Sequence, residues 1–216
     1  MAEASRNADL GRLRRSVTAL RAYFGRLLTP PLPGDGFLLV GFLEGVVGWG
    51  LSWVFANYPA VAPFGIIISI TLLWAGLTAG IVFIGVTYTV PTVRRTHVWL
   101  VWGALNLLAT AVNLLAVAGL LPVELAAYGY WHPWFAVIGL GYLVTGMYKW
   151  ESPQLRRQER IVYALSGVAT LGLLAVTVGG VSLVVARNVF VVGGLVQLLP
   201  IGYDVLADAV LIARRQ

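Results

Sequence analysis

Six long apolar stretches constrain this chain more than any other feature of its sequence. They cover residues 37–58, 64–90, 98–121, 133–149, 161–186 and 189–213. Because a helix of ~20 apolar residues crosses the hydrocarbon core of a bilayer, each stretch can form a transmembrane helix, and the fourth is the shortest. The composition, 59% hydrophobic and 11% charged, excludes an ordinary soluble domain. The sequence therefore predicts an all-α integral membrane protein with a six-helix transmembrane domain, residues 37–216, behind a polar segment, residues 1–36.

The N-terminal segment, residues 1–36, contains a pattern typical of a basic amphipathic helix. Between residues 6 and 28, Leu13, Leu20 and Leu27 recur on one helical face, with arginines between them. A helix of this kind binds the anionic inner leaflet of a membrane, and we expect this one to lie there. The alternative is a helix that packs on a partner protein.

The basic residues of the connections predict the orientation of the chain. With six spans, every lysine and arginine except Arg187 falls on one side of the membrane. Positive residues collect on the cytoplasmic side, so we expect a multi-pass protein of the cell (inner) membrane with both termini in the cytoplasm. Lys149 is the only lysine, and this preference for arginine indicates a prokaryotic source.

Several kinds of chemistry are excluded by residues that the sequence lacks. Without cysteine the chain cannot form a disulfide, a thiolate metal site or an iron–sulfur cluster. His97 and His132 fall on opposite sides of the predicted bundle, so they cannot both ligate one haem. No phosphate-binding loop, zinc-protease motif or nucleophile elbow is present. We therefore expect no cofactor and no resident metal, and an enzyme acting on lipid is the least favoured class.

The basic charge has a simpler explanation than binding to nucleic acid. The net charge is +6 at pH 7. In a membrane protein this excess serves orientation, so the expected partner is the lipid bilayer and no nucleic acid is expected. A membrane protein partner or a second copy of the chain is the further alternative.

Three carboxylates lie within the predicted spans, where an ionisable side chain costs ~2.5 to 3.5 kcal/mol on insertion scales. At 1.5 Å per residue, Glu44 lies ~10 Å from the cytoplasmic end of its span, and Asp204 and Asp208 lie ~15 and ~9 Å from the same end. All three acids therefore belong to the cytoplasmic half of the membrane.

Uncharged polar residues are expected at the same depth as these acids. Gln197 shares a helical stripe with Asp204 and Asp208, and Asn106 falls ~12 Å from the cytoplasmic end of the third span. Tyr142 of the fourth span reaches a similar level. The predicted substrate- or ion-binding residues are Glu44, Asp204, Asp208, Asn106, Tyr142 and Gln197.

Two interpretations of this polar layer lead to different functions. Carboxylates at bilayer depth titrate or coordinate hard cations, which indicates a transporter or channel-like protein with a proton or cation site. Alternatively the acids are only structural, with Asp208 paired to Lys149, Arg214 or Arg215 and the others bonded to tyrosine or asparagine side chains. The protein would then be a non-catalytic membrane subunit or scaffold that docks partner proteins or lipid, and basic residues of a partner could also meet the acids.

Tryptophan and glycine positions give two further expectations. Tryptophans at span ends are typical of an interfacial belt. They are Trp53, Trp131 and Trp134 toward the outside and Trp99, Trp102 and Trp150 toward the inside, whereas Trp49 and Trp74 lie deeper and are expected to pack. Small residues four apart let helices approach closely in lipid. Such pairs are Gly41 with Gly45, Gly48 with Ser52, and Gly76 with Gly80.

Overall fold

The computed structural model describes residues 2–149, 155–179 and 183–214, with side chains from Arg14 and without those of residues 183–187, 213 and 214. Over these residues the chain is helical and contains no β-strand. The long helices are α1 (Ala2–Leu27), α2 (Gly34–Asn57), α3 (Ile66–Tyr88), α5 (His97–Val117), α7 (His132–Met147), α8 (Arg157–Val178) and α9 (Leu183–Arg214). Short helical turns, η1 (Pro59–Val61), α4 (Pro91–Arg94) and α6 (Val123–Ala126), occupy connections.

The predicted class of an all-helical membrane protein is confirmed. Helices α2, α3, α5, α8 and α9 are each long and apolar enough to cross a membrane. Helix α7 coincides with the fourth apolar stretch but has only 16 residues. At 1.5 Å per residue it is ~24 Å long, which is shorter than the ~30 Å hydrocarbon core. Helix length alone therefore accounts for five spans among the described residues.

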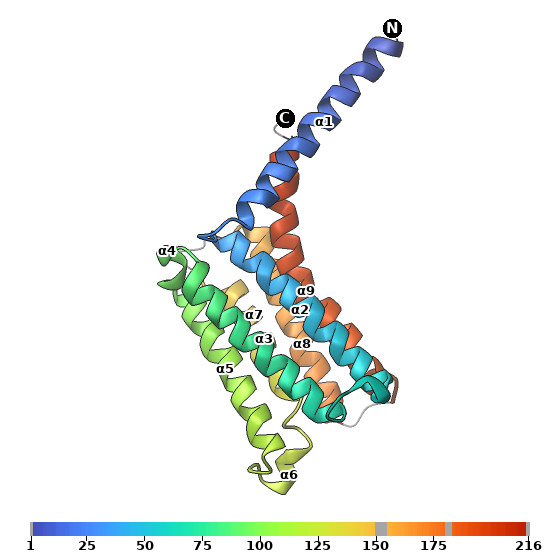
Figure 1. Cartoon of the computed structure of the whole chain (residues 1–216), viewed down its shortest axis with the longest axis vertical. Helices are drawn as coiled ribbons and strands as arrows, with labels where there is room; N and C mark the ends of the chain where they lie inside the picture. The colour runs from blue at the N-terminus through green and yellow to red at the C-terminus, as the bar shows by residue number, and fades with distance from the viewer. Residues whose placement is uncertain (1, 150–154, 180–182, 215–216) are drawn as a thin grey trace.

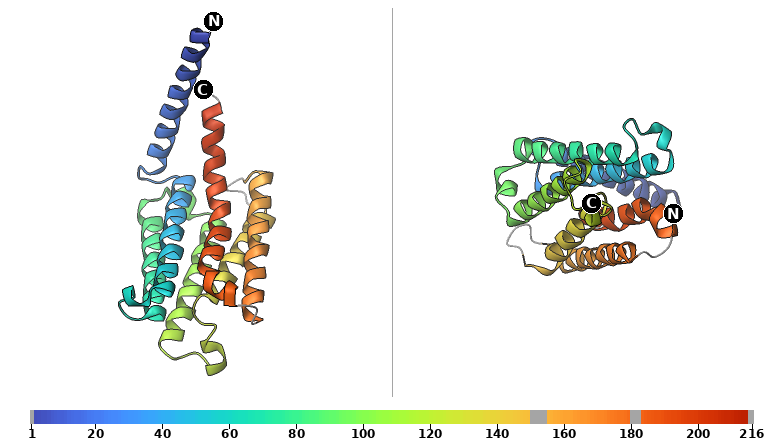
Figure 2. Two further views of the ribbon diagram at one scale, coloured as in Figure 1. Left: turned by 90° about the vertical axis from the view of Figure 1, so that its right-hand side faces the viewer. Right: turned by 90° about the horizontal axis from the view of Figure 1, so that it is seen from below.

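The six long helices after α1 form a closed ring in the order of the chain. Each contacts the next, from α2 through α3, α5, α7 and α8 to α9, and α9 packs on α2 to close the ring. The view along the bundle shows this arrangement (Figure 2, right). Both termini lie at one end of the bundle, which we call the terminal end (Figure 1). There α2 and α8 begin and α9 ends, whereas η1 and α6 lie at the other end.

The bundle is apolar outside and partly polar inside, which suits a lipid solvent. Large apolar side chains such as Leu72, Leu107 and Leu165 are exposed on the helices. Polar side chains such as Ser52 and Thr170 are fully buried between helices. Water-soluble proteins have the opposite distribution, because they must bury apolar surface and expose polar surface. The surface therefore supports the same conclusion as the hydropathy of the helices.

Helix packing depends on glycines, but only partly on the predicted ones. A Cβ atom on Gly146 of α7 would lie 2.5 Å from the carbonyl oxygen of Arg160 in α8, so the two backbones meet there. A Cβ on Gly45 would lie 2.6 Å from Leu198, which confirms its place in the α2–α9 contact. The prediction for Gly41, Gly76 and Gly80 is wrong within this chain, because a Cβ on any of them meets no atom within 4 Å.

Helix α1 is confirmed as a helix and is attached to the bundle by its second half. Tyr23 and Leu27 are buried against Val205 and Ala209 of α9. The rest of α1 extends away from the terminal end, beyond the bundle (Figure 1). An interfacial helix would instead lie across that end, so binding of α1 to the inner leaflet stays a prediction.

Candidate functional site

The ring of helices encloses a cavity of about 660 Å³. All six residues predicted from the sequence line it, and they come from four helices: Glu44 on α2, Asn106 on α5, Tyr142 on α7, and Gln197, Asp204 and Asp208 on α9. Side chains of α3 and α8 complete the wall. The cavity begins at the terminal end, because the connections before α5 and α8 also line it.

Burial increases from the terminal end into the cavity. The Asp208 side chain is 36% exposed, and that of Arg156, at the start of α8, is 38% exposed. One turn further along α9, Asp204 is 8% exposed, and Gln197 is 2% exposed. The gradient indicates that the cavity opens to water at the terminal end and that Gln197 lies deep inside it.

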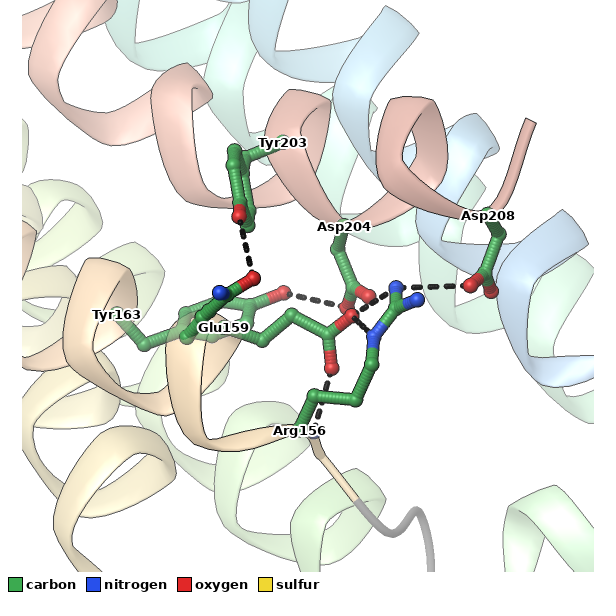
Figure 3. A network of polar contacts seen from close by, with 7 residues as sticks. Arg156, Glu159, Tyr163, Tyr203, Asp204 and Asp208 are labelled. Carbon is green, nitrogen blue, oxygen red and sulfur yellow. Dashed lines mark hydrogen bonds and ion pairs between the residues drawn. The ribbon is translucent and has the colours of Figure 1, made fainter. Parts of the chain in front are cut away.

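Arg156 is the centre of an ion-pair network at this end (Figure 3). It precedes the first turn of α8, and its backbone N–H donates to the Glu159 carboxylate at 2.6 Å. Its guanidinium also donates to Glu159 and forms an ion pair with Asp208, with an N–O distance of 2.8 Å. The hydrogen bond to Glu159 is the largest of the effects that raise the pKa of Arg156. The network therefore ties the start of α8 to the end of α9.

Asp208 pairs with Arg156, a residue that was not among its predicted partners. Arg156 takes the place expected for Lys149, because α8 begins beside the last turns of α9. The side chains of Arg214 and Arg215 lie outside the described residues. The tyrosine partner predicted for Asp204 is confirmed, since the Tyr163 hydroxyl donates to its carboxylate at 3.3 Å (Figure 3).

Glu44 differs from the acids of α9. It lines the cavity on α2 and is half-buried. No hydrogen bond or ion pair joins it to any residue that the structure describes, so neither the tyrosine nor the asparagine partner expected from the sequence is found there. A carboxylate in this position is available to a proton or to a bound cation.

Gln197 also reaches the cavity without a partner. Both polar atoms of its side-chain amide are buried and have no hydrogen bond among the described residues. Its backbone carbonyl, in contrast, accepts a hydrogen bond from the Tyr142 hydroxyl. A buried amide without partners costs ~1 to 3 kcal/mol, and such a cost is recovered when a ligand or water supplies the missing bonds.

Two asparagines of α5 have different roles. Asn113 bonds between segments: its amide donates to the Gly129 carbonyl at 2.7 Å and its oxygen accepts from Trp134 at 2.6 Å. Asn106 donates within its own helix, to the Trp102 carbonyl at 2.9 Å. Its side chain lines the cavity, as its predicted place in the site requires.

Sequence reasoning missed four polar residues of the site. Asp35, Arg156, Glu159 and Tyr163 all line the cavity. A signal for Glu159 was present, because an acid three residues into a helix is typical of N-terminal capping. Arg156 had been counted only as an orientation charge of the loop. Asp35 lies in the first turn of α2, which the sequence placed just outside the span.

The missed acids, Asp35 and Glu159, add negative charge to the cavity wall. The charged residues in the cavity wall are five acids and one base: Asp35, Glu44, Glu159, Asp204, Asp208 and Arg156. Tyr23 of α1 lies close to them, and its buried hydroxyl has no hydrogen-bond partner among the described residues. Burial, followed by the negative charges of Asp35, Asp208 and Asp204, raises the Tyr23 pKa to about 12. Such a field attracts cations from solution.

Tryptophans contribute more to the cavity than to the membrane interface. The cavity wall contains Trp49, Trp74, Trp99, Trp102 and Trp134. The interfacial position predicted for Trp134 is wrong, because this side chain is only 2% exposed and its indole bonds to Asn113. The Trp102 indole donates to Thr145 of α7 at 3.1 Å, so it too faces inward. Trp150 lies outside the described residues.

The fold and cavity define a class: a helical membrane protein with an internal chamber lined by acids and aromatic rings. The described residues contain no group of three or more histidines, aspartates or glutamates arranged to hold a metal ion. Comparisons with models of known families, with curated proteins and with solved structures found no match. The function must therefore be argued from the cavity itself.

Proposed function

We propose that the protein is a small transporter or channel-like protein that passes protons or other cations through its central cavity. One observation carries the proposal: the polar residues singled out from the sequence line a single cavity, and Glu44 has no counter-ion among the described residues. A carboxylate inside a membrane protein is costly. One that is present without a partner therefore indicates a functional pathway. The excess of acids in the cavity wall supports cations as the transported class.

The test of this proposal is flux through the purified protein in lipid vesicles. Vesicles with an imposed proton gradient and membrane potential should lose the gradient faster with the protein than without it. A fluorescent pH indicator trapped inside follows protons, and exchange of K⁺ for Na⁺ shows whether an inorganic cation can replace them. Protein that is correctly inserted but gives the rate of protein-free vesicles for every cation would contradict the proposal.

We further propose that α7 is a sixth span and that both termini are cytoplasmic. Its neighbours α5 and α8 run along both sides of it, which supports a crossing despite its length. The common position of the two termini at one end of the bundle supports an even number of crossings (Figure 2, left). The location of nearly all basic residues at that end supports a cytoplasmic orientation.

Cysteine labelling tests this topology directly, because the natural chain contains no cysteine. Single cysteines replacing Glu124, on α6, and Gln158, in the first turn of α8, both lie at exposed positions. With six spans, a membrane-impermeant maleimide should label Glu124→Cys on intact cells and Gln158→Cys only after the cells are opened. If α7 does not cross, both positions lie on the same side of the membrane and label alike.

A scaffold is the second candidate, and α1 is the observation that favours it. Only the second half of α1 packs on the bundle, so its first half is left for another molecule (Figure 1). Under this hypothesis, removing residues 1–28 should weaken a purified complex severalfold, whereas Glu44→Gln should leave it intact. Pull-down with a C-terminal tag and quantitation of the co-purified subunit measures both. A complex that survives the truncation would count against docking through α1.

A further inference from the structure

Aromatic rings form a large part of the cavity wall, beside its acids. Trp102, Tyr142 and Tyr163 form a continuous series, with ring centroids 5.1 Å apart between Trp102 and Tyr142 and 5.5 Å apart between the two tyrosines. Trp74 of α3 and Trp134 of α7 form a second pair, with ring centroids 4.7 Å apart. Aromatic faces attract cations through their quadrupoles, most strongly when water is excluded.

An inorganic cation does not match this wall. Calcium requires six to eight oxygen ligands, and magnesium requires a nearly ideal octahedron. No cluster of three or more acidic or histidine side chains fit for a metal occurs among the described residues. Glu159, Asp204 and Asp208 already bond to Arg156 or Tyr163, whereas Glu44 has no partner among the described residues. An organic cation, in contrast, needs only one counter-charge, because its substituents make contacts with apolar and aromatic surface.

The volume leads to the same class of ligand. At about 660 Å³, the cavity has the size of a small-molecule site. A bare metal ion would leave nearly all of this space to water. An ammonium ion with several alkyl or aryl substituents would fill a substantial part of it.

Gln197 is the independent sign that a ligand belongs here. Its side chain is 2% exposed, lines the cavity, and has both amide atoms without a partner among the described residues. An amide can accept a hydrogen bond from an ammonium N–H or donate one to an oxygen of the ligand. The Tyr142 hydroxyl fixes the backbone beside it, so the amide is presented by a rigid wall.

We propose that the cavity binds an alkylated organic ammonium ion, with Glu44 as its counter-ion, Gln197 as its hydrogen-bond partner, and Trp102 and Tyr142 as the ring faces that contact its substituents. The inference rests on the proposed transport function, for which it names the substrate class. The acids of the cavity wall outnumber its one base and therefore favour a cation inside.

Equilibrium dialysis of the purified full-length protein tests the inference, with radiolabelled benzyldimethylammonium, which keeps one N–H for Gln197, as the probe. We expect saturable binding at one site per chain. Unlabelled benzyldimethylammonium should compete, whereas benzyl alcohol, which keeps the ring but has no charge, and K⁺ should not compete at the same concentrations. Equal competition by benzyl alcohol or by K⁺ would overturn the inference.

Variants separate the charge from the rings. Glu44→Gln should weaken binding ~100-fold, which is the factor expected for losing a nearby charge in a partly desolvated site. Trp102→Leu should weaken it about tenfold, and Trp102→Phe, which keeps a ring, only a few-fold. The controls Glu124→Gln and Trp53→Leu lie outside the cavity wall and should bind like the natural protein. Trp102→Leu and Trp102→Phe with unchanged affinity would overturn the aromatic contact.

The binding assay and the flux assay test the two proposals separately. If the vesicles pass protons but the protein does not bind benzyldimethylammonium, the substrate class is wrong and the proposed function stands. If the protein binds the probe with the expected dependence on Glu44 and Trp102 but passes no cation, the site exists in a protein that does not transport. In that case the proposed function is wrong.

Discussion

Replacing Glu44 with glutamine is expected to reduce cation flux in reconstituted vesicles by ~100-fold or more. A carboxylate 4 Å from a cation contributes about 4 kcal/mol at an effective dielectric constant of 20, and glutamine removes the charge while keeping the shape. Glutamine also cannot release a proton. The initial rate of gradient decay per molecule of protein, measured with equal amounts of inserted protein, gives the comparison.

The matched control for this variant is Glu124→Gln. Glu124 lies on α6, is exposed, and does not line the cavity. It should retain the natural rate, which shows that the loss is specific to the position of the charge. Glu44→Gln should keep its thermal unfolding midpoint in detergent, because it removes a half-buried charge without a partner. A Glu44→Gln protein that is folded and retains the natural flux would exclude Glu44 from the pathway.

The second large effect is expected from filling the cavity. Gly41 lines the cavity on the same face of α2 as Glu44, and a Cβ built on it meets no atom within 4 Å. Gly41→Phe should therefore place a ring in the cavity without displacing the backbone. We expect flux to fall at least tenfold, because the added ring occupies the path and displaces the water that a charge requires there.

Gly76→Phe is the control for added volume. Gly76 also has open space around its Cβ position, but it does not line the cavity, so its ring should point into lipid. Both variants add the same side chain to a transmembrane helix at a site without a clash. Equal losses in the two variants would assign the effect to the helices in general and not to the cavity. Flux assays and unfolding midpoints on both proteins decide between these outcomes.

The positions of the helices could be predicted from the sequence, but their neighbours could not. Hydrophobic runs located α2, α3, α5 and α7 to within four residues. The predicted boundary between the last two spans is wrong, because α8 ends at Val178 and α9 begins at Leu183, not at 186 and 189. Depth along each helix placed Glu44 near Asp204 in height. Height does not fix direction or neighbour. The contact of α2 with α9 joins residues far apart in the chain and depends on close approach at Gly45. The spacing of small residues predicts an approach there, but no local pattern identifies α9 as the neighbour. The shared cavity is a consequence of that contact.

The errors in the predicted site have the same physical origin. Trp134 was assigned to the interface because it lies near the end of an apolar stretch, yet helix α7 turns it inward to Asn113. Arg156 was treated as an orientation charge because its partner Asp208 lies on another helix. Whether a side chain faces lipid or the interior depends on which face of its helix it occupies. That face is set by the neighbouring helices, which the sequence alone does not supply.

The closure of the ring between α2 and α9 affects how the protein is made. Helices enter the membrane in the order of synthesis, and the first of the ring must wait for the last before it can be packed on both sides. Until α9 is released from the ribosome, the face of α2 that carries Glu44 is exposed to lipid, because Leu198 does not yet cover Gly45. A chain stopped before residue 183 would carry Glu44 but none of Gln197, Asp204 and Asp208. The nascent protein therefore has no working site until its final helix is in place, and incomplete chains should be inert and open to membrane proteases.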